Sequence, residues 1–146
     1  MRIQKLDFPV KIDIGCGKGK IENFVGIDCL DFGQEIVWDV TKGIPLTDNS
    51  VSEIHTSHFL EHIENKDLQL MFDEFYRVCE DGALVTIIMP HADTIEAHYL
   101  CHYSMWSENK IEGIVKDTLG KMEIKTMERD GIHLKAELVI KKNATT

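Results

Sequence analysis

The spacing of apolar residues changes from strand-like to helix-like and back along the chain. Short apolar runs predict four strands before the first helix, at Val10–Ile14, Phe24–Ile27, Glu35–Trp38 and Ser52–Thr56. From Lys66 to Cys79, apolar residues recur every three or four positions, which predicts a helix with one buried stripe, formed by Leu68, Met71, Phe72, Phe75 and Cys79. We expect Asp81-Gly82 to end this helix.

The second half of the chain continues the alternation. Ala83–Met89 is a continuous apolar run, which is typical of a central strand buried on both faces. A loop at His91–Trp106 and a helix at Ser107–Leu119 are expected to follow. Two further strand-like runs, Met122–Arg129 and Ile132–Lys141, flank Asp130-Gly131, a pair typical of a two-residue hairpin. The last residues, Asn143–Thr146, are expected to fray.

Strands that alternate with helices predict an α/β protein with a mostly parallel sheet and a C-terminal antiparallel hairpin. One connection does not fit the simplest version of this pattern. The stretch between Gly19 and Asp28 is shorter than the dozen or so residues that a crossover helix and its turns normally take. We therefore expect the first crossover helix to be shortened or missing, unless these two strands are not parallel.

Composition narrows the class of protein. The 146 residues fit one domain, and 43% hydrophobic and 28% charged residues are typical of a globular chain. No apolar run approaches the roughly 20 residues of a membrane-spanning helix, and the N-terminus lacks a signal-peptide core, so we expect a cytoplasmic protein without a membrane partner. A net charge of −9 argues against binding nucleic acid and favours a small-molecule, glycan or protein partner.

The four cysteines form no CxxC pair. We expect reduced, mostly buried thiols and no bound metal.

Glycines follow the first predicted strand, at Gly15, Gly17 and Gly19. Without Cβ atoms, such a turn lets the backbone pass close to a ligand. Asp28, at the end of the second strand, is placed to accept hydrogen bonds from ribose hydroxyls. Lys20 stands where a dinucleotide-binding fingerprint needs a third glycine, which disfavours NAD. A sulfonium cofactor without phosphate would tolerate the short crossover, and Asp13 would suit its ammonium group.

Four segments together carry a family resemblance: KIDIGCGKG, VGIDC, VWDVTKGIPLTDNSVSEIHTSHFLEHI and FDEFYRVCEDGALVTIIMPH, in this order from Lys11 to about His91. They resemble the class I S-adenosylmethionine-dependent methyltransferases, particularly an abridged branch of small, type 11-like members. The resemblance implies a Rossmann-like sheet, a single methyltransferase domain over residues 1–146, and S-adenosylmethionine as cofactor.

The resemblance also assigns cofactor-binding residues. In such proteins the glycine loop holds the methionine part of the cofactor, and the acid after the second strand holds the ribose. The Asp-hydrophobic pair after the third strand contacts the adenine. The corresponding residues of this chain are Asp13, Gly15, Cys16, Gly17, Asp28, Cys29, Asp39 and Val40, and Ser57 at the end of the fourth strand completes the set.

His58 follows the fourth strand, where the acceptor site of the resembled family begins. A histidine there could remove a proton from the acceptor, so we expect His58 to be the catalytic residue. His58, Glu61 and His62 also match the H-x-x-E-H pattern of zinc hydrolases, which needs both histidines on one helical face. A protein that binds the cofactor without catalysis is a further alternative, and a second copy of the chain could complete the site as a homodimer.

Overall fold

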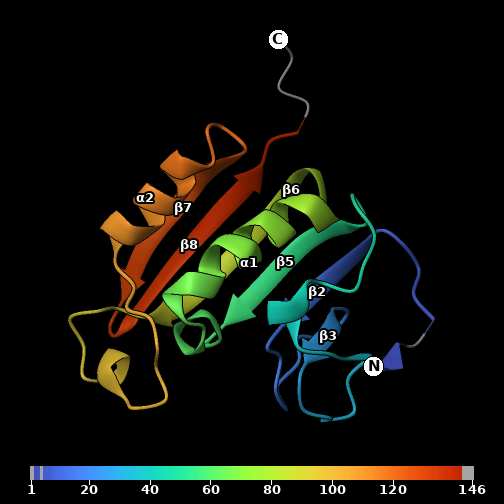
Figure 1. Ribbon diagram of the computed structural model, residues 1–146, viewed down its shortest axis with the longest axis horizontal. Helices are drawn as coiled ribbons and strands as arrows, with labels where there is room; N and C mark the ends of the chain where they lie inside the picture. Colours follow the sequence, from blue (N-terminus) through green and yellow to red (C-terminus); the bar gives the residue numbers. More distant parts are fainter. Residues whose placement is uncertain (1, 4, 143–146) are drawn as a thin grey trace.

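The structure is a computed structural model and describes residues 2–3 and 5–142. Its centre is a sheet of eight strands in the order β1-β4-β3-β2-β5-β6-β8-β7 (Figure 1). The strands are β1 (Arg2–Ile3), β2 (Val10–Ile14), β3 (Val25–Asp28), β4 (Ile36–Val37), β5 (Val51–Ser57), β6 (Cys79–Pro90), β7 (Met122–Asp130) and β8 (His133–Ile140). The helices are α1 (Asn65–Val78) and α2 (Glu108–Asp117), with 3-10 turns η1 (Val40–Lys42), η2 (Leu60–His62) and η3 (Glu96–His98).

The sheet is mostly parallel, as the sequence predicts. Strands β4, β3, β2, β5 and β6 run parallel to one another. Strands β8 and β7 form the expected antiparallel hairpin beside β6. Strand β1, which pairs antiparallel with β4, was not predicted, because two residues are too short for a periodic signal. The expected fraying of Asn143–Thr146 lies outside the described residues.

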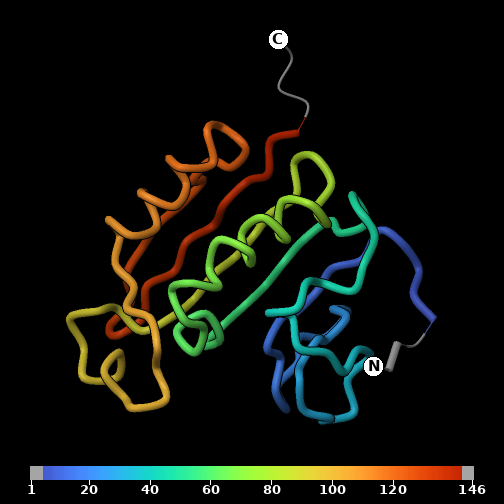
Figure 2. Tube along the Cα trace, viewed as in Figure 1, coloured from blue at the N-terminus to red at the C-terminus, as the bar shows by residue number. Residues whose placement is uncertain are grey.

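The first crossover contains no helix. Between β2 and β3, residues 15–24 form turns and bends that return the chain beside β2, which Figure 2 shows as a tight blue loop. The prediction of a shortened or missing helix is therefore confirmed, and the two strands are parallel. The next two crossovers hold only η1, so both α-helices among the described residues follow β5 in the sequence.

Both α-helices lie on the same face of the sheet (Figure 1). Side chains of both helices line one groove. The expectation that the central apolar strand is buried on both faces holds only in part. In β6, Val85, Ile87 and Met89 are fully buried, whereas the opposite face has the half-buried Leu84 and Ile88 beside the buried Thr86 and Pro90. No α-helix of the described chain covers the face on which Leu84 and Ile88 lie.

Several predicted boundaries shift. The first helix ends at Val78, not at Asp81-Gly82, and Cys79 already pairs with Val51 as the first residue of β6. The hairpin loop is Gly131-Ile132 rather than Asp130-Gly131, since Gly131 supplies the positive φ of 59° at the first loop position.

The buried stripe of the first helix is confirmed, with Val78 taking the place expected for Cys79. The second helix begins after Ser107, whose Oγ accepts the N–H of Lys110. No helix among the described residues has both the length and the apolar character that crossing a bilayer requires.

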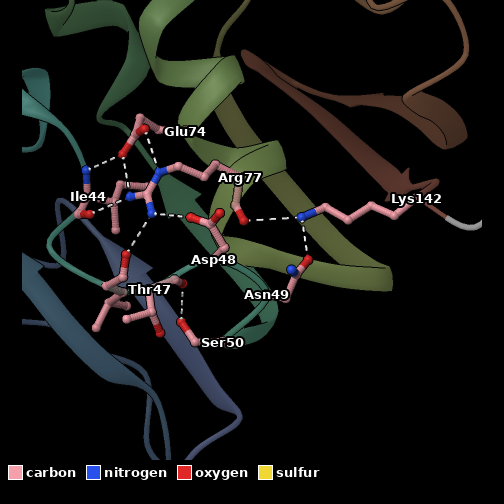
Figure 3. A network of polar contacts seen from close by, with 9 residues as sticks. Ile44, Thr47, Asp48, Asn49, Ser50, Glu74, Arg77 and Lys142 are labelled. Carbon is pink, nitrogen blue, oxygen red and sulfur yellow. Dashed lines mark hydrogen bonds and ion pairs between the residues drawn. The ribbon is translucent and has the colours of Figure 1, made fainter.

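A polar network fastens α1 to the loop before β5 (Figure 3). Arg77 donates from Nε to Glu74 Oε1, and its two terminal nitrogens donate to the carbonyl oxygens of Ile44 and Leu46 and to Asp48. Glu74 Oε2 accepts the N–H of Ile44 at 2.7 Å. The Arg77 guanidinium lowers the pKa of the Glu74 carboxyl by hydrogen bonding, although partial burial opposes this shift.

We predict that Arg77→Ala lowers the free energy of unfolding by roughly 2–3 kcal/mol, because charge-assisted hydrogen bonds and two carbonyl partners are lost together. Gln69→Ala, on the exposed side of the same helix, is the matched control and should change stability by less than about 0.5 kcal/mol. Urea denaturation measures both variants, and equal effects would contradict the assigned importance of the network.

The network also predicts a pH dependence of stability. Because the folded-state pKa of Glu74 is lowered, its contribution is complete above the unfolded-state pKa of about 4.3 and is lost as the pH falls through the folded value. Glu74→Gln should therefore destabilise the protein at pH 7. The difference from wild type should shrink as the pH falls from about 5 to about 3. A difference that stays constant over this range would contradict the assigned ion pair.

Candidate functional site

The carboxyl ends of β2, β3, β4 and β5 meet at one edge of the sheet, because these strands are parallel neighbours. In open α/β sheets, ligands bind at this edge. The segments that leave it are the glycine loop, defined as Gly15–Gly19, the turn after Asp28, the turn after Val37, and the turn after Ser57. Every residue that the sequence assigns to a site lies on or beside one of these segments.

The glycine loop turns sharply as it leaves β2. Gly15 and Gly17 have φ values of 68° and 54°, which glycine adopts without steric cost. The N–H of Gly15 donates to the carbonyl oxygen of Ile27, and the N–H of Gly17 donates to Asp28 Oδ2 at 3.0 Å. A Cβ atom added at Gly17 would meet no atom within 4 Å, so this part of the loop borders open space.

Asp28 fastens the loops at the edge to one another. Besides Gly17, its carboxylate accepts the N–H of Leu30 at Oδ1, 3.0 Å away. Its backbone oxygen accepts the N–H of Trp38, which follows β4. A carboxylate offers about four lone-pair positions, so Asp28 retains capacity for hydroxyl donors. Asp28 is also partly exposed.

Asp13 lies beneath the loop and not at its surface. Its side chain is among the buried acids, with the residue 4% exposed. Oδ2 accepts the N–H of Ile21 at 3.1 Å, and Oδ1 lies 3.4 Å from Nδ1 of His55. These contacts hold the far end of the short crossover against the sheet.

The remaining predicted residues differ in their access to the edge. Asp39 caps η1 by accepting the N–H and the hydroxyl of Thr41 at Oδ1. Val40 is 3% exposed and belongs to the core. Cys29 is exposed, and Ser57 is half-buried at the end of β5.

Cys16 is partly buried and lies close to several carboxylates. Its Sγ packs towards β3, since a Cβ added at Gly26 would lie 2.9 Å from it. Burial and, to a lesser extent, the charges of Asp13 and Asp28 together raise the pKa of the Cys16 thiol to about 11. Burial disfavours any charged form, but the carboxylates that contribute to this shift would repel a phosphate and attract a cation.

The expectation of mostly buried thiols is wrong, although all four cysteines are free. Only Cys79 is buried, whereas Cys29 and Cys101 are exposed. Burial raises the pKa of Cys79 to about 12.

The turn after β5 joins the predicted catalytic residue to the glycine loop. The ring of Phe59 covers Gly15, where an added Cβ would lie only 2.4 Å from the ring. His58 has a φ of 55°, and its side chain is 47% exposed. Its Nδ1 lies 3.4 Å from Oε2 of Glu61, a residue only 2% exposed whose carboxylate oxygens have no hydrogen-bond partner among the described residues.

A cavity of about 530 Å³ opens beside His58. The His58 ring packs edge-to-face on His133 of β8, with centroids 4.9 Å apart. The rest of the lining comes from β6 and from the two hairpin strands: Ile88, Glu128, Arg129, Asp130 and Lys135. A second cavity of about 560 Å³ lies between α1 and α2. Neither includes a residue of the glycine loop.

The structure does not favour the zinc-hydrolase alternative for the H-x-x-E-H segment. Only Leu60–His62 is helical, as a 3-10 turn, and the left-handed backbone of His58 lies outside it. His58 packs on His133, whereas His62 packs on His102. The two histidines therefore do not share the helical face that the alternative requires.

Solved structures with this fold include methyltransferases. An S-adenosylmethionine-dependent methyltransferase from Methanosarcina mazei has a TM-score of 0.70 at 17% identity, over 93% of this chain and 94% of that one. One from Aquifex aeolicus has a TM-score of 0.68 at 19% identity, over 93% and 85%. The 1,6-didemethyltoxoflavin-N1-methyltransferase of Burkholderia thailandensis, solved with its substrate and S-adenosylhomocysteine, has a TM-score of 0.71 at 11% identity, over 91% and 71%.

No protein-family model and no curated protein matches the sequence. The chain has the fold of the class I S-adenosylmethionine-dependent methyltransferases, as the sequence resemblance implies. The fold is abridged in this chain because the connections between β2, β3, β4 and β5 contain no α-helix.

Gly15→Ala should destabilise the protein by on the order of 1–3 kcal/mol, because a side chain is strained at this φ and meets the Phe59 ring. Gly19→Ala is the matched control. Its added Cβ meets nothing within 4 Å and its φ is not positive, so stability should change by less than about 0.5 kcal/mol. Thermal or urea unfolding compares them, and a Gly15→Ala variant as stable as Gly19→Ala would refute the packing of Phe59 on Gly15.

Proposed function

We propose that this protein binds S-adenosylmethionine at the carboxyl ends of β2, β3 and β4 and transfers its methyl group to an acceptor beside His58. The observation that carries the proposal is the glycine loop, which is hydrogen-bonded to Asp28 and lies among acids. No helix N-terminus of the described chain lies beneath this loop. A phosphate-bearing cofactor would need that helix N-terminus. The cationic sulfonium and ammonium groups of S-adenosylmethionine need acids instead.

The donor and acceptor groups at the edge fit this cofactor. In the proposed complex, Asp28 accepts from the ribose hydroxyls while it keeps its two backbone donors. Backbone groups of Gly15, Cys16 and Gly17 surround the methionine part. Cys16 takes part through its backbone, because its side chain is turned towards β3. Asp13 acts from below through its charge and through the loop that it holds.

The adenine would lie between the turns after β3 and β4, with Cys29 on one side and Asp39 on the other. Val40 is buried, so its contribution would come from its backbone. Ser57 would complete the site near the transferred methyl. Of the two lysines in the crossover, Lys20 already pairs with Glu35 at 3.3 Å and donates to the carbonyl oxygen of Phe24, so it is poorly placed to attract a phosphate. The other, Lys18, is exposed within the glycine loop itself.

His58 is the proposed catalytic base. Methyl transfer is an in-line displacement at carbon, and alignment of donor and acceptor supplies much of the acceleration, on the order of 7–11 kcal/mol. A base is required where the acceptor loses a proton. The buried carboxylate of Glu61 faces His58 Nδ1 and would orient the ring, leaving Nε2 for the acceptor.

The acceptor class remains broad in this proposal: a small molecule, a glycan or a protein group that enters the cavity beside His58. The Burkholderia thailandensis neighbour binds a small molecule, which supports the first of these. Residence in the cytoplasm, a single domain over residues 1–146 and a homodimer that completes the site are further parts of the proposal. A protein that binds the cofactor without transferring methyl groups is the second candidate, because the crossover helix that would shelter the ligand is missing.

S-adenosylhomocysteine should bind the purified protein and raise its melting temperature by mass action. Asp28→Ala should weaken binding by roughly 5–150-fold, the equivalent of about 1–3 kcal/mol, because the ribose hydroxyls and two backbone donors lose their partner. Asp31→Asn removes a neighbouring exposed charge and should leave the affinity within about twofold. Calorimetric titration measures all three proteins. Unchanged affinity in folded Asp28→Ala would contradict the assigned ribose site.

His58→Asn should reduce turnover by roughly 10²–10⁴-fold with little change in cofactor affinity, as expected when binding and proton transfer use different groups. Asparagine tolerates the left-handed backbone at this position, so the fold should persist. His98→Asn, an exposed histidine between β6 and α2, is the control. The readout is S-adenosylhomocysteine formation with an acceptor found by screening. Full activity of His58→Asn would rule out His58 as the base.

A further inference from the structure

The segment between β6 and α2 folds back onto the turn that follows β5. The N–H groups of Tyr103 and Ser104 both donate to the carbonyl oxygen of Glu61, at 2.7 and 3.1 Å. Ser104 Oγ donates to the carbonyl oxygen of Leu60 at 2.9 Å and accepts from Nε1 of the fully buried Trp106. This buried anchor fixes the two segments relative to each other.

The anchor brings His62 beside the sequence neighbours Cys101 and His102, which lie far from it in the sequence. His62, Cys101 and His102 each offer one metal-ligating atom, and these atoms all lie within 4.8 Å of one another. The two imidazole rings are edge-to-face, with centroids 4.8 Å apart. His62 and Cys101 are exposed and His102 is half-buried, so a solvated ion can reach the cluster.

Two imidazole nitrogens and one thiolate form a ligand set that binds zinc in preference to harder cations. In a tetrahedral zinc site, ligand atoms are separated by roughly 3.3–3.7 Å, as follows from Zn–N and Zn–S bonds of about 2.0–2.3 Å. The cluster therefore needs a contraction of about 1 Å. Rotation of exposed side chains can provide this movement without changing the anchor.

A hydrogen bond already favours the metal-binding tautomer of His62. Nδ1 of His62 lies 2.8 Å from the carbonyl oxygen of Cys101. When Nδ1–H donates to this oxygen, the lone pair of the ring resides on Nε2 and is available to a metal, which is the usual arrangement of metal-binding histidines.

A second ligand lacks a partner. Nδ1 of His102 is buried and has no hydrogen-bond partner among the described residues. Buried polar atoms are normally satisfied, so this nitrogen calls for a partner that the described part of the chain does not supply. A bound cation would be such a partner.

We propose that His62, Cys101 and His102 form a Zn²⁺ site that clamps the segment after β6 onto the turn after β5. As the zinc–sulfur bond forms, the Cys101 thiol loses its proton to solvent, and no electrons are transferred. The three side chains leave one tetrahedral position for water. The site requires no cofactor, so it goes beyond the proposed methyltransferase function and stands or falls separately from it.

The clamp would act next to the proposed base. His62 follows Glu61 directly, and Glu61 faces His58. Binding of zinc would restrict the segment that packs on Glu61 and so stabilise the turn on which His58 lies. The metal would thus order one wall of the site without contacting the transferred methyl group.

The test uses the full chain, freed of metal with a chelator, and titrated with Co²⁺ and then with Zn²⁺. We expect one equivalent of Co²⁺ to give a thiolate-to-metal charge-transfer band, and one equivalent of Zn²⁺ to abolish it and raise the melting temperature. Failure of the wild-type protein to bind one equivalent of either ion would overturn the proposal. So would stoichiometric binding without the thiolate band.

Variants locate the ion. Cys101→Ser should abolish the charge-transfer band. Cys101→Ser and His102→Ala should each weaken zinc binding. The loss should exceed the roughly 10–100-fold that follows when a metal ligand loses its own hydrogen-bond partner. The matched controls Cys29→Ser, another exposed thiol, and His98→Asn, a histidine of the same loop, should retain the band and the affinity. Zinc binding that persists in Cys101→Ser and His102→Ala would place the ion elsewhere and refute the site.

Discussion

The constraint on which the structure depends is the short connection between β2 and β3. Residues 15–24 must bridge two parallel strands without a helix, so their backbone N–H groups cannot satisfy one another in helical turns. Carboxylates replace the helix. Asp28 accepts from Gly17, Asp13 accepts from Ile21, and Glu35 accepts from Gly26 within β3.

The same acids set the chemistry of the edge. Burial and, to a lesser extent, the charges of these acids raise the pKa of the Cys16 thiol, and the same charges disfavour a phosphate at the loop. A cofactor that carries positive charge gains where a dinucleotide would lose. The abridged crossover and the proposed preference for S-adenosylmethionine thus have one physical origin.

The sequence was informative where a pattern repeats locally. Periodic apolar residues predicted α1 and the mostly parallel sheet, and the length of the first crossover predicted its missing helix. The Asp81-Gly82 pair predicts the end of α1, whereas Gly82 adopts its positive φ of 79° inside β6.

Contacts between distant segments could not be read in this way. Nothing in the spacing of Phe59 and Gly15 indicated that the ring would cover the loop. The grouping of His62 with Cys101 and His102 depends on buried hydrogen bonds of Ser104, which no local pattern encodes. The continuous apolar run of β6 predicts burial on both faces, but both α-helices lie on one face of the sheet (Figure 1), and the other face of the strand is only partly buried.

The most direct test of the central claim is the amide NMR spectrum of the protein titrated with S-adenosylhomocysteine. The account predicts that shift changes concentrate in the three turns that contain Gly15–Gly17, Asp28–Leu30 and Asp39–Thr41, with few changes along α1 and α2. Shift changes confined to the groove between α1 and α2, or none at millimolar ligand, would contradict it.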